Sequence, residues 1–170
     1  MNYGIVLKLT GKLLLLEALV MVLPLGISLV YGQKDAVAFI ISIACTALFG
    51  FILSRFSNKK TQIKIRDSLA IVSLVWILYS LFGSLPFLFS GSINSLVDAF
   101  FETVSGFTTT GSTILTDIES LPKGILFWRS LTIWLGGMGI LVFTVAVFPA
   151  LGMGGFQIFK AESPGPTTEK

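Results

Sequence analysis

Long stretches without a charged residue divide this chain, and they limit what it can fold into. Three ranges contain no charged residue and a fourth contains only Glu17: 36–54, 68–97, 130–159 and 13–33. About 20 apolar residues in a row are enough for a helix to cross the hydrocarbon core of a bilayer. Such a span must be helical, because lipid offers the backbone no hydrogen-bond partners. The sequence therefore predicts an all-α polytopic membrane protein with four spans, at about 10–30, 36–55, 68–89 and 125–148.

The composition excludes the common soluble classes. Hydrophobic residues make up 54% of the chain and charged residues 12%, against roughly 25% charged residues in globular proteins. A soluble domain of this composition would expose large apolar patches, so a soluble enzyme and a disordered tail are excluded. The chain has no His and a single Cys, Cys45, which excludes a His-based metal site, a His general base and an intrachain disulfide. No enzymatic activity is expected.

Basic residues predict the orientation of the spans. The segment between the second and third spans holds five basic residues against one acid, Asp67. Loops with such an excess of Lys and Arg stay in the cytoplasm. This places the N-terminus and the tail after Lys160 inside and the segment 90–124 outside. The five basic residues are Arg55, Lys59, Lys60, Lys64 and Arg66.

The segment 90–124 contains a predicted helix that is too short to cross the membrane. Ser95 and Asp98 fit a capping box, in which a Ser side chain and an acid three residues later satisfy the first free groups of a helix. The helix predicted from this start covers 96–105 and ends at Gly106, a residue suited to the left-handed C′ position. Ten residues give about 15 Å, half of a bilayer core. A half-length helix between two full spans indicates a re-entrant loop.

A run of Thr, Gly and Ser follows this short helix, Phe107-Thr-Thr-Thr-Gly-Ser-Thr113. The C-terminal end of a helix carries partial negative charge, which favours a cation there. An extended run can direct several carbonyl oxygens at one ion and so replace its hydration shell. Gly111 allows the backbone angles that turn a carbonyl inward. The alternative is an ordinary polar surface loop at 108–113, and the flanking spans favour the ion path over it.

Several motifs resemble, in order, those of one transporter family. They are Phe100-Phe-Glu-Thr-Val-Ser-Gly-Phe-Thr-Thr-Thr-Gly-Ser-Thr113, Trp128-Arg-Ser130, Trp134-Leu-Gly-Gly-Met-Gly-Ile140 and Lys160-Ala-Glu-Ser-Pro-Gly-Pro166. Together they closely resemble the N-terminal portion of the TrkH/KtrB (Trk/Ktr/HKT) potassium-transporter family. The resemblance covers essentially the whole chain. It implies two N-terminal transmembrane helices followed by one potassium-channel-like unit of helix, re-entrant pore helix, filter loop and helix.

The resemblance divides the chain into four parts. They are an N-terminal transmembrane helix pair at 1–57, a basic cytoplasmic loop at 58–67, the first pore repeat at 68–160 and a cytoplasmic tail or linker at 161–170. The repeat in turn consists of a span at 68–89, the pore helix at 96–105, the filter at 108–113 and a span at 125–148.

The resemblance also implies which residues bind the ion. The residues that would face the ion path, with potassium as the bound ion, are Thr108, Thr109, Thr110, Gly111 and Ser112. The backbone carbonyls of Thr109 and Thr110 would supply the inner ligands. In this family a Gly at the position of Gly111 goes with potassium selectivity, and a Ser there goes with sodium. No organic cofactor is implied.

Family members carry four pore units in one chain, and this chain contains one. It is therefore expected to be the N-terminal part of a potassium uptake protein, with the remaining pore repeats as partners. The family also implies a homodimer, a cytosolic nucleotide-binding subunit of the TrkA/KtrA type and membrane lipid, but no nucleic acid. Its place would be the plasma (inner) membrane of a bacterium or archaeon. Two alternatives stay open: a single-repeat protein that assembles as a homotetrameric cation pore, and a non-transporting membrane structural protein.

Three residues outside the Thr-rich run are expected to support the pore: Glu102, Gly106 and Arg129. Arg129 begins the fourth span, where it either anchors the helix at the membrane interface or forms an ion pair with an acid of the short helix. The two acids within reach are Glu102 and Asp98.

Two further features concern the spans themselves. Glu17 is expected one turn into the first span, close to Lys12, where its side chain can extend to interfacial water. Gly136 and the glycines that follow it are expected to let the fourth span come close to the short helix, because small residues allow membrane helices to approach.

Overall fold

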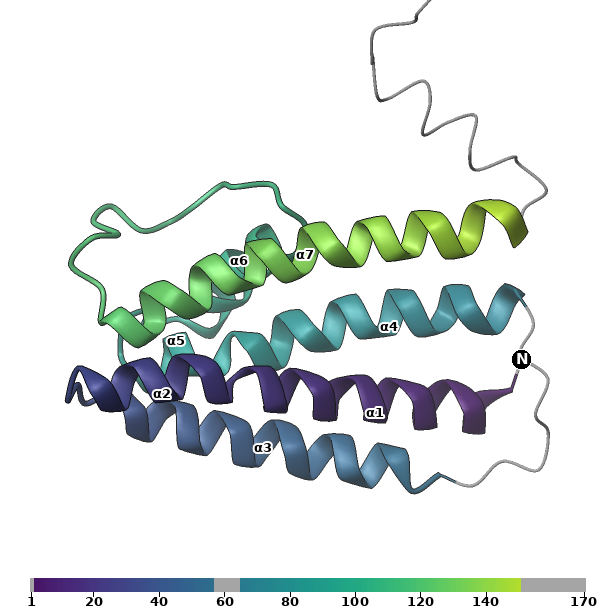
Figure 1. The fold of residues 1–170 in the computed structure, drawn as a ribbon, viewed down its shortest axis with the longest axis horizontal. Coiled ribbons are helices and arrows are strands. Elements are labelled where there is room, and N and C mark those ends of the chain that lie inside the picture. The colour runs from purple at the N-terminus through teal and green to yellow at the C-terminus, as the bar shows by residue number, and fades with distance from the viewer. Residues whose placement is uncertain (1, 57–64, 151–170) are drawn as a thin grey trace, which may run out of the picture. The chain divides into compact units, whose positions relative to one another are not determined.

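The computed structural model describes residues 2–56 and 65–150 (Figure 1). The predicted loop at 58–67 and tail at 161–170 therefore lie largely or wholly outside the described residues. The chain divides into two compact units, 1–137 and 138–170. The described helices are α1 (Tyr3–Val20), α2 (Val22–Val30), α3 (Ala36–Ser54), α4 (Ile65–Gly83), α5 (Leu85–Phe89), α6 (Leu96–Phe107) and α7 (Lys123–Ala150).

Four helical segments of the described residues are long and apolar enough to cross a membrane: Tyr3–Val30, Ala36–Ser54, Arg66–Phe89 and Lys123–Leu141. Every regular element among the described residues is a helix, which confirms the predicted all-α polytopic class. The first span begins at Tyr3 rather than near residue 10. It begins there because the carbonyl of Asn2 accepts hydrogen bonds from the N–H groups of Ile5 and Val6, both at 3.1 Å.

Two prolines account for the breaks within the spans. A proline inside a helix lacks an N–H group and crowds the carbonyl four residues earlier. Pro24 accounts for the break at Met21, where α1 gives way to α2. Pro86 accounts for the break at Ser84, where α4 gives way to α5. Both breaks lie toward the same end of the helices (Figure 1).

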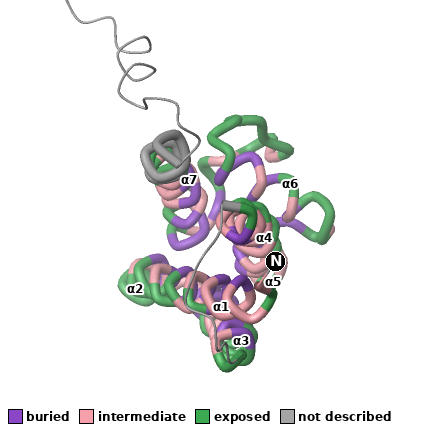
Figure 2. The backbone as a smooth tube through the Cα atoms, turned by 90° about the vertical axis from the view of Figure 1, so that its right-hand side faces the viewer, coloured by how far each residue is buried: buried purple, intermediate pink, exposed green. Residues whose placement is uncertain are grey.

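Helix α1 packs along α3 and α4, and Figures 1 and 2 both show α1 and α3 side by side. Gly11 and Gly50 meet at the contact with α3, where a Cβ added to Gly11 would lie 2.6 Å from the carbonyl oxygen of Gly50. Small residues of this kind let membrane helices approach closely. On α4, the hydroxyl of Tyr79 donates to the carbonyl of Leu13 at 2.7 Å. This hydrogen bond joins α1 to α4.

Polar contacts join the helices at both ends. At one end the N–H group of Asn2 donates to the carboxylate of Asp67 at 2.9 Å, so α1 and α4 begin next to each other. At the other end the N–H group of Lys123 donates to the side-chain oxygen of Gln33 at 2.6 Å. The turn 31–35 therefore lies at the beginning of α7.

The buried core gathers around Phe107, which ends α6, and Trp128 of α7. The indole N–H of Trp128 donates to the carbonyl of Gly83 at 2.9 Å and so joins α7 to α4. The opposite faces of the helices carry exposed apolar side chains, among them Leu19 and Leu48 (exposed segments are green in Figure 2). Such exposure suits contact with lipid and would promote aggregation in water.

The structure contradicts the interfacial placement of Glu17. Its side chain is 1% exposed and lies on the face of α1 that meets α4, next to Gly83. The early start of α1 explains the difference, because Glu17 lies about 21 Å along the helix from Tyr3 at 1.5 Å per residue. The carboxyl group is therefore deep in the span, beyond the reach of interfacial water.

A candidate ion-binding segment after helix α6

Helix α6 is a short amphipathic helix that begins at Leu96. The side-chain oxygen of Ser95 accepts a hydrogen bond from the N–H group of Asp98 at 3.4 Å, which caps the first turn. The helix runs to Phe107, two residues beyond the predicted range 96–105. At 1.5 Å per residue its length is about 18 Å, still too short to cross a bilayer.

The helix ends in a Schellman motif with Thr109 at the C′ position. The N–H group of Thr109 donates to the carbonyl of Gly106, and the N–H group of Thr110 donates to that of Ser105, both at 3.0 Å. Thr109 has a φ of 56°, the left-handed conformation that this motif requires and that Gly usually provides. The prediction that Gly106 terminates the helix is therefore wrong.

Gly106 and Gly136 serve helix packing instead. A Cβ added to Gly106 would lie 3.2 Å from the Cβ of Thr132 on α7 and closer still to its hydroxyl oxygen. A Cβ added to Gly136 would lie 2.7 Å from the carbonyl carbon of Phe107. Because the last turn of α6 rests on α7 through these two glycines, the helix continues past Gly106. The close approach expected at Gly136 is confirmed.

Residues 108–112, which we call the candidate filter segment, are neither helix nor strand. Thr109 and Gly111 have positive φ values of 56° and 77°. A positive φ is open to Gly but strains a β-branched residue, and such strain persists only where the surroundings hold it. Nothing lies within 4 Å of a Cβ added to Gly111. The backbone angle, and not a lack of space, therefore calls for Gly at position 111.

Local hydrogen bonds hold the candidate filter segment in this conformation. The hydroxyl of Thr108 donates to the carbonyl of Val104 at 2.7 Å and lies 2.8 Å from the hydroxyl of Thr110. The hydroxyl of Ser105 donates to the carbonyl of Ser112 at 2.6 Å. The segment is thus fastened to the last turn of α6 at both of its ends. Ser105 is not among the residues predicted to support the pore, although a hydroxyl in the last turn of a helix is a signal for such a contact.

Four carbonyl oxygens of the segment accept no hydrogen bond from the described residues: those of Thr108, Thr109, Thr110 and Gly111. Ser112 differs, because its carbonyl is bonded to Ser105. All five residues of the segment are exposed. Unpaired carbonyls are tolerated at membrane depth only where they line a cavity or are covered by protein. Four of the five predicted ion-path residues therefore present a free backbone carbonyl, whereas the carbonyl of Ser112 is already bonded.

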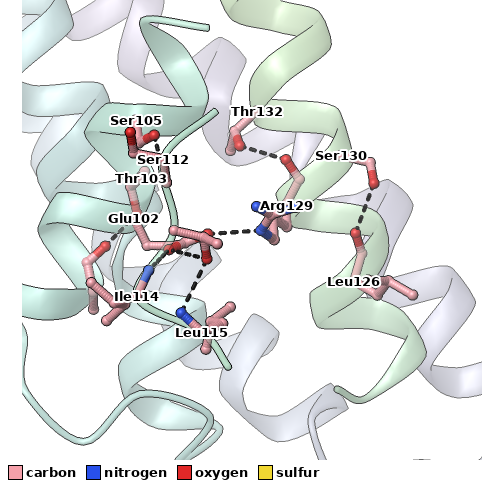
Figure 3. Close-up of polar contacts among 12 residues, drawn as sticks. Glu102, Thr103, Ser105, Ser112, Ile114, Leu115, Leu126, Arg129, Ser130 and Thr132 are labelled. Atoms are coloured by element: carbon pink, nitrogen blue, oxygen red, sulfur yellow. Dashed lines mark hydrogen bonds and ion pairs between the residues drawn. The ribbon is translucent and has the colours of Figure 1, made fainter. Parts of the chain in front are cut away.

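Glu102 fixes the chain just beyond the candidate filter segment (Figure 3). Its carboxylate accepts hydrogen bonds from Nε of Arg129 at 2.7 Å, the hydroxyl of Thr113 at 2.9 Å and the N–H group of Ile114 at 3.1 Å. Glu102 is 3% exposed, and a buried carboxylate of this kind needs such partners. The ion pair considered for Arg129 forms with Glu102, whereas Asp98 is exposed.

The arrangement suits a cation. The C-terminal end of α6 presents partial negative charge, and the free carbonyls that follow it are the ligand type used for dehydrated alkali ions. A complete shell around a hard cation takes roughly six to eight oxygens. The four free carbonyls of the candidate filter segment are fewer than such a shell requires.

A family model named TrkH and described as "Cation transport protein" matches residues 33–170. The chain belongs to the TrkH family. The family and the four apolar helices together make it a multi-pass membrane protein.

Several TrkH-family proteins are similar over nearly the whole chain. The "Trk system potassium uptake protein TrkH" of Vibrio parahaemolyticus is 40% identical over 172 residues, which cover 99% of this chain and 35% of that protein. The protein of the same name from Escherichia coli K12 is 40% identical over 98% of this chain and 35% of its own length. "Trk system potassium uptake protein TrkG" of the same strain is 36% identical over 95% and 34%. The chain thus spans about a third of the length of these TrkH-family relatives.

A solved TrkH structure has the same fold. The crystal structure of the potassium transporter TrkH from Vibrio parahaemolyticus superposes with a TM-score of 0.84 and 38% sequence identity. The match covers 91% of this chain and 34% of that one. The helices described above therefore have the arrangement of the corresponding third of a TrkH transporter.

Proposed function

We propose that this chain is the N-terminal part of a potassium uptake protein and supplies one of its ion-binding loops. Its relatives are named potassium uptake proteins, and the chain corresponds to about a third of each. The remaining pore repeats complete the ring of ligands. Uptake is driven by the membrane potential, which contributes about 2.3 kcal/mol per charge per 100 mV. No organic cofactor takes part.

The free carbonyls of the candidate filter segment are the observation that carries this proposal. They follow the C-terminal end of α6, accept no hydrogen bond from the described residues, and lie on an exposed surface. Thr109 and Thr110 contribute the inner ligands to potassium, and Gly111 keeps the backbone angle that the ligand geometry needs. Contacts between α6 and α7 support the segment, through the ion pair of Glu102 with Arg129 and the close packing at Gly106.

We place the protein in the plasma (inner) membrane of a bacterium or archaeon, with the N-terminus in the cytoplasm. The beginnings of α1 and α4 lie together, and the turn 31–35 lies with the beginning of α7. The beginning of α4, with Arg66, lies at the first of these two ends, and the sequence around it, 55–67, holds five basic residues against one acid. The excess of Lys and Arg favours the cytoplasm for that end.

The proposed partners rest on the resemblance to the family. We propose a homodimer of full-length chains in lipid, regulated by a cytosolic nucleotide-binding subunit of the TrkA/KtrA type, with no nucleic acid bound. Copurification of a tagged full-length chain with such a subunit tests this arrangement. A monomer that binds no cytosolic subunit would contradict it.

Substitution of Gly111 by Ser in the full-length gene tests the ion path. Ser strains the backbone where φ is 77°, by about 1–3 kcal/mol. We therefore expect the preference for potassium over sodium to fall about tenfold, which is the change that 1.4 kcal/mol produces. The measurement is rubidium and sodium uptake in a bacterial strain that lacks its own potassium transporters.

Gly91→Ser is the matched control for this experiment. Gly91 also has a positive φ, 71°, and also has open space around an added Cβ, but it lies outside the candidate filter segment. The control should lose stability and keep its ion preference. An unchanged ion preference in Gly111→Ser, or an equal change in both variants, would contradict the assignment of the filter.

A further inference from the structure

Glu17 is a buried acid that the proposed ion path does not use. Its side chain is 1% exposed, and neither carboxyl oxygen has a hydrogen-bond partner among the described residues. The chain's own helices bury it, so further parts of a longer protein would meet a site that is already closed. An unpaired charge in such a place is strongly unfavourable, so buried acids are found either paired with a cation or neutralised by a proton.

The carboxyl group lies where α1, α4 and α6 meet. A Cβ added to Gly83 of α4 would lie 3.1 Å from Oε1 of Glu17, 2.9 Å from Cγ2 of Thr103 and 3.0 Å from Cε2 of Phe107. Phe107 is the residue directly before the candidate filter segment, and its ring also packs on Trp76 and Tyr79. Glu17 therefore lies against the residues that support that segment.

The surroundings do not offer the oxygen ligands that a metal cation needs, which number roughly six or more. Thr103 turns its methyl group toward Gly83 and donates its hydroxyl to the carbonyl of Ala99. The carbonyl of Gly83 accepts from Trp128. The unpaired hydroxyl of Thr10 lies two turns away along α1, about 10 Å. A proton, by contrast, needs only one carboxyl oxygen.

No cation from α1, α2, α3 or α5 neutralises Glu17. Helix α3 has no charged residue between Asp35 and Arg55, and α2 and α5 have none at all. On α1 itself, Lys12 is exposed and Lys8 lies still closer to the beginning of the helix.

Helices α4 and α6 bring no cation to the carboxyl group either. Tyr79 is the titratable side chain of α4 near this region, and its hydroxyl donates to the carbonyl of Leu13. Glu102 of α6 is paired with Arg129 of α7. The remaining charged residues of α4 and α6 all lie in a first helical turn: Arg66, Asp67 and Asp98.

We propose that Glu17 is a proton-binding site buried among α1, α4 and α6, and that its proton keeps the end of α6 in place. Loss of the proton would leave an unpaired negative charge beside Phe107, and α6 would shift to admit water or a cation. The candidate filter segment would then be displaced together with the end of α6. The effect on ion uptake rests on the proposed function, whereas the proton site itself does not.

Infrared spectroscopy of the full-length protein in lipid tests the proton site directly. We expect the carbonyl stretch of a protonated carboxylic acid at neutral pH, its disappearance at alkaline pH, and its absence from Glu17→Gln at every pH. Glu119→Gln, which changes an exposed acid, should keep the band. A spectrum in which Glu17→Gln removes only a carboxylate band would overturn the proposal. So would a carboxylate band that shifts when sodium replaces choline, because it would indicate a bound metal cation.

The pH profile of rubidium uptake tests the consequence. Uptake by the unmodified protein should fall about tenfold per pH unit once most of the carboxyl has lost its proton. Gln imitates the protonated acid, so Glu17→Gln should stay active and lack this fall. An identical fall in both proteins would overturn the role in uptake. If Gly111→Ser keeps its ion preference while the infrared band depends on Glu17, the proposed function fails and the proton site stands.

Discussion

Thr109 is strained, and several hydrogen bonds hold it in place. The bonds of Thr109 and Thr110 to the last turn of α6 fix its backbone on either side. Gly adopts the same φ at no steric cost and is the usual residue at such a helix end. Thr at position 109 therefore makes the fold less stable than Gly would. The turn does not require Thr, so its side chain has to serve another purpose. A carbonyl and hydroxyl kept in a fixed place beside an ion would be such a gain.

Replacement of Thr109 by Gly should separate stability from function. The change removes strain of about 1–3 kcal/mol and adds back roughly 0.5–1 kcal/mol of backbone entropy. We expect the thermal unfolding midpoint in detergent to rise and the preference for potassium over sodium to fall. Thr110→Gly is the control, because Thr110 does not have a positive φ and should only lose stability. A Thr109→Gly protein with lower stability would show that Thr109 is not strained.

The carboxylate of Glu102 serves three donors, and Gln cannot serve all of them. Glu102→Gln retains one acceptor oxygen and adds two N–H donors, which leaves Arg129 or the N–H group of Ile114 without its partner. We expect the free energy of unfolding to fall by about 1–3 kcal/mol, measured by thermal or denaturant unfolding in detergent. Asp98→Asn, at an exposed acid on the same helix, should change it by much less. Equal effects of the two changes would argue against the buried ion pair.

At the scale of elements, α6 is positioned by α7. The contacts of Gly106 with Thr132 and of Gly136 with Phe107 bring the backbones of the two helices close together. A packed core does not deform smoothly when a methyl group is added. A small change on α7 is thus transmitted to the residue that precedes the candidate filter segment.

Gly136→Ala should disturb this contact strongly. Its Cβ would lie 2.7 Å from the carbonyl carbon of Phe107, so one of the two helices has to move, at a cost of about 1–3 kcal/mol. The neighbouring Gly137 offers a matched control, because its added Cβ meets nothing closer than Thr109 Cγ2 at 3.9 Å. Gly137→Ala should be neutral or stabilising, since Ala favours a helix by roughly 1 kcal/mol over Gly. Similar unfolding midpoints for the two variants would contradict the close approach.

The ends of the elements were harder to predict than the elements. Charge spacing predicts the spans because a lipid core excludes charged residues along a length that is easily recognised. The end of α6 depends instead on contacts with residues far along the chain. Gly106 looks like a helix terminator, but Thr132 and Gly136 hold it within the helix. The terminating residue, Thr109, carries no local signal for a positive φ.

At the scale of the whole molecule, the sequence separates lipid-facing from polar regions but does not show which polar groups meet. The pairing of Arg129 with an acid of α6 could be predicted from chemistry. The choice of Glu102 over Asp98 required the fold. The hydrogen bonds that Thr113 and Ile114 donate to Glu102 could not be predicted. The donor of Ile114 is a backbone N–H group, which almost every residue possesses. The burial of Glu17 was missed because the helix begins seven residues earlier than expected.

The local closure of the Schellman motif has a consequence for biosynthesis. Every hydrogen bond that the described part of the chain makes to the candidate filter segment, from the carbonyl of Val104 to that of Ser112, lies within nine consecutive residues. Contacts so close in sequence form rapidly and need no distant partner. The candidate filter segment can therefore acquire its shape on the ribosome, as soon as its own residues have been translated. If the segment binds an ion as proposed, assembly of the ion path would be a docking of preformed loops.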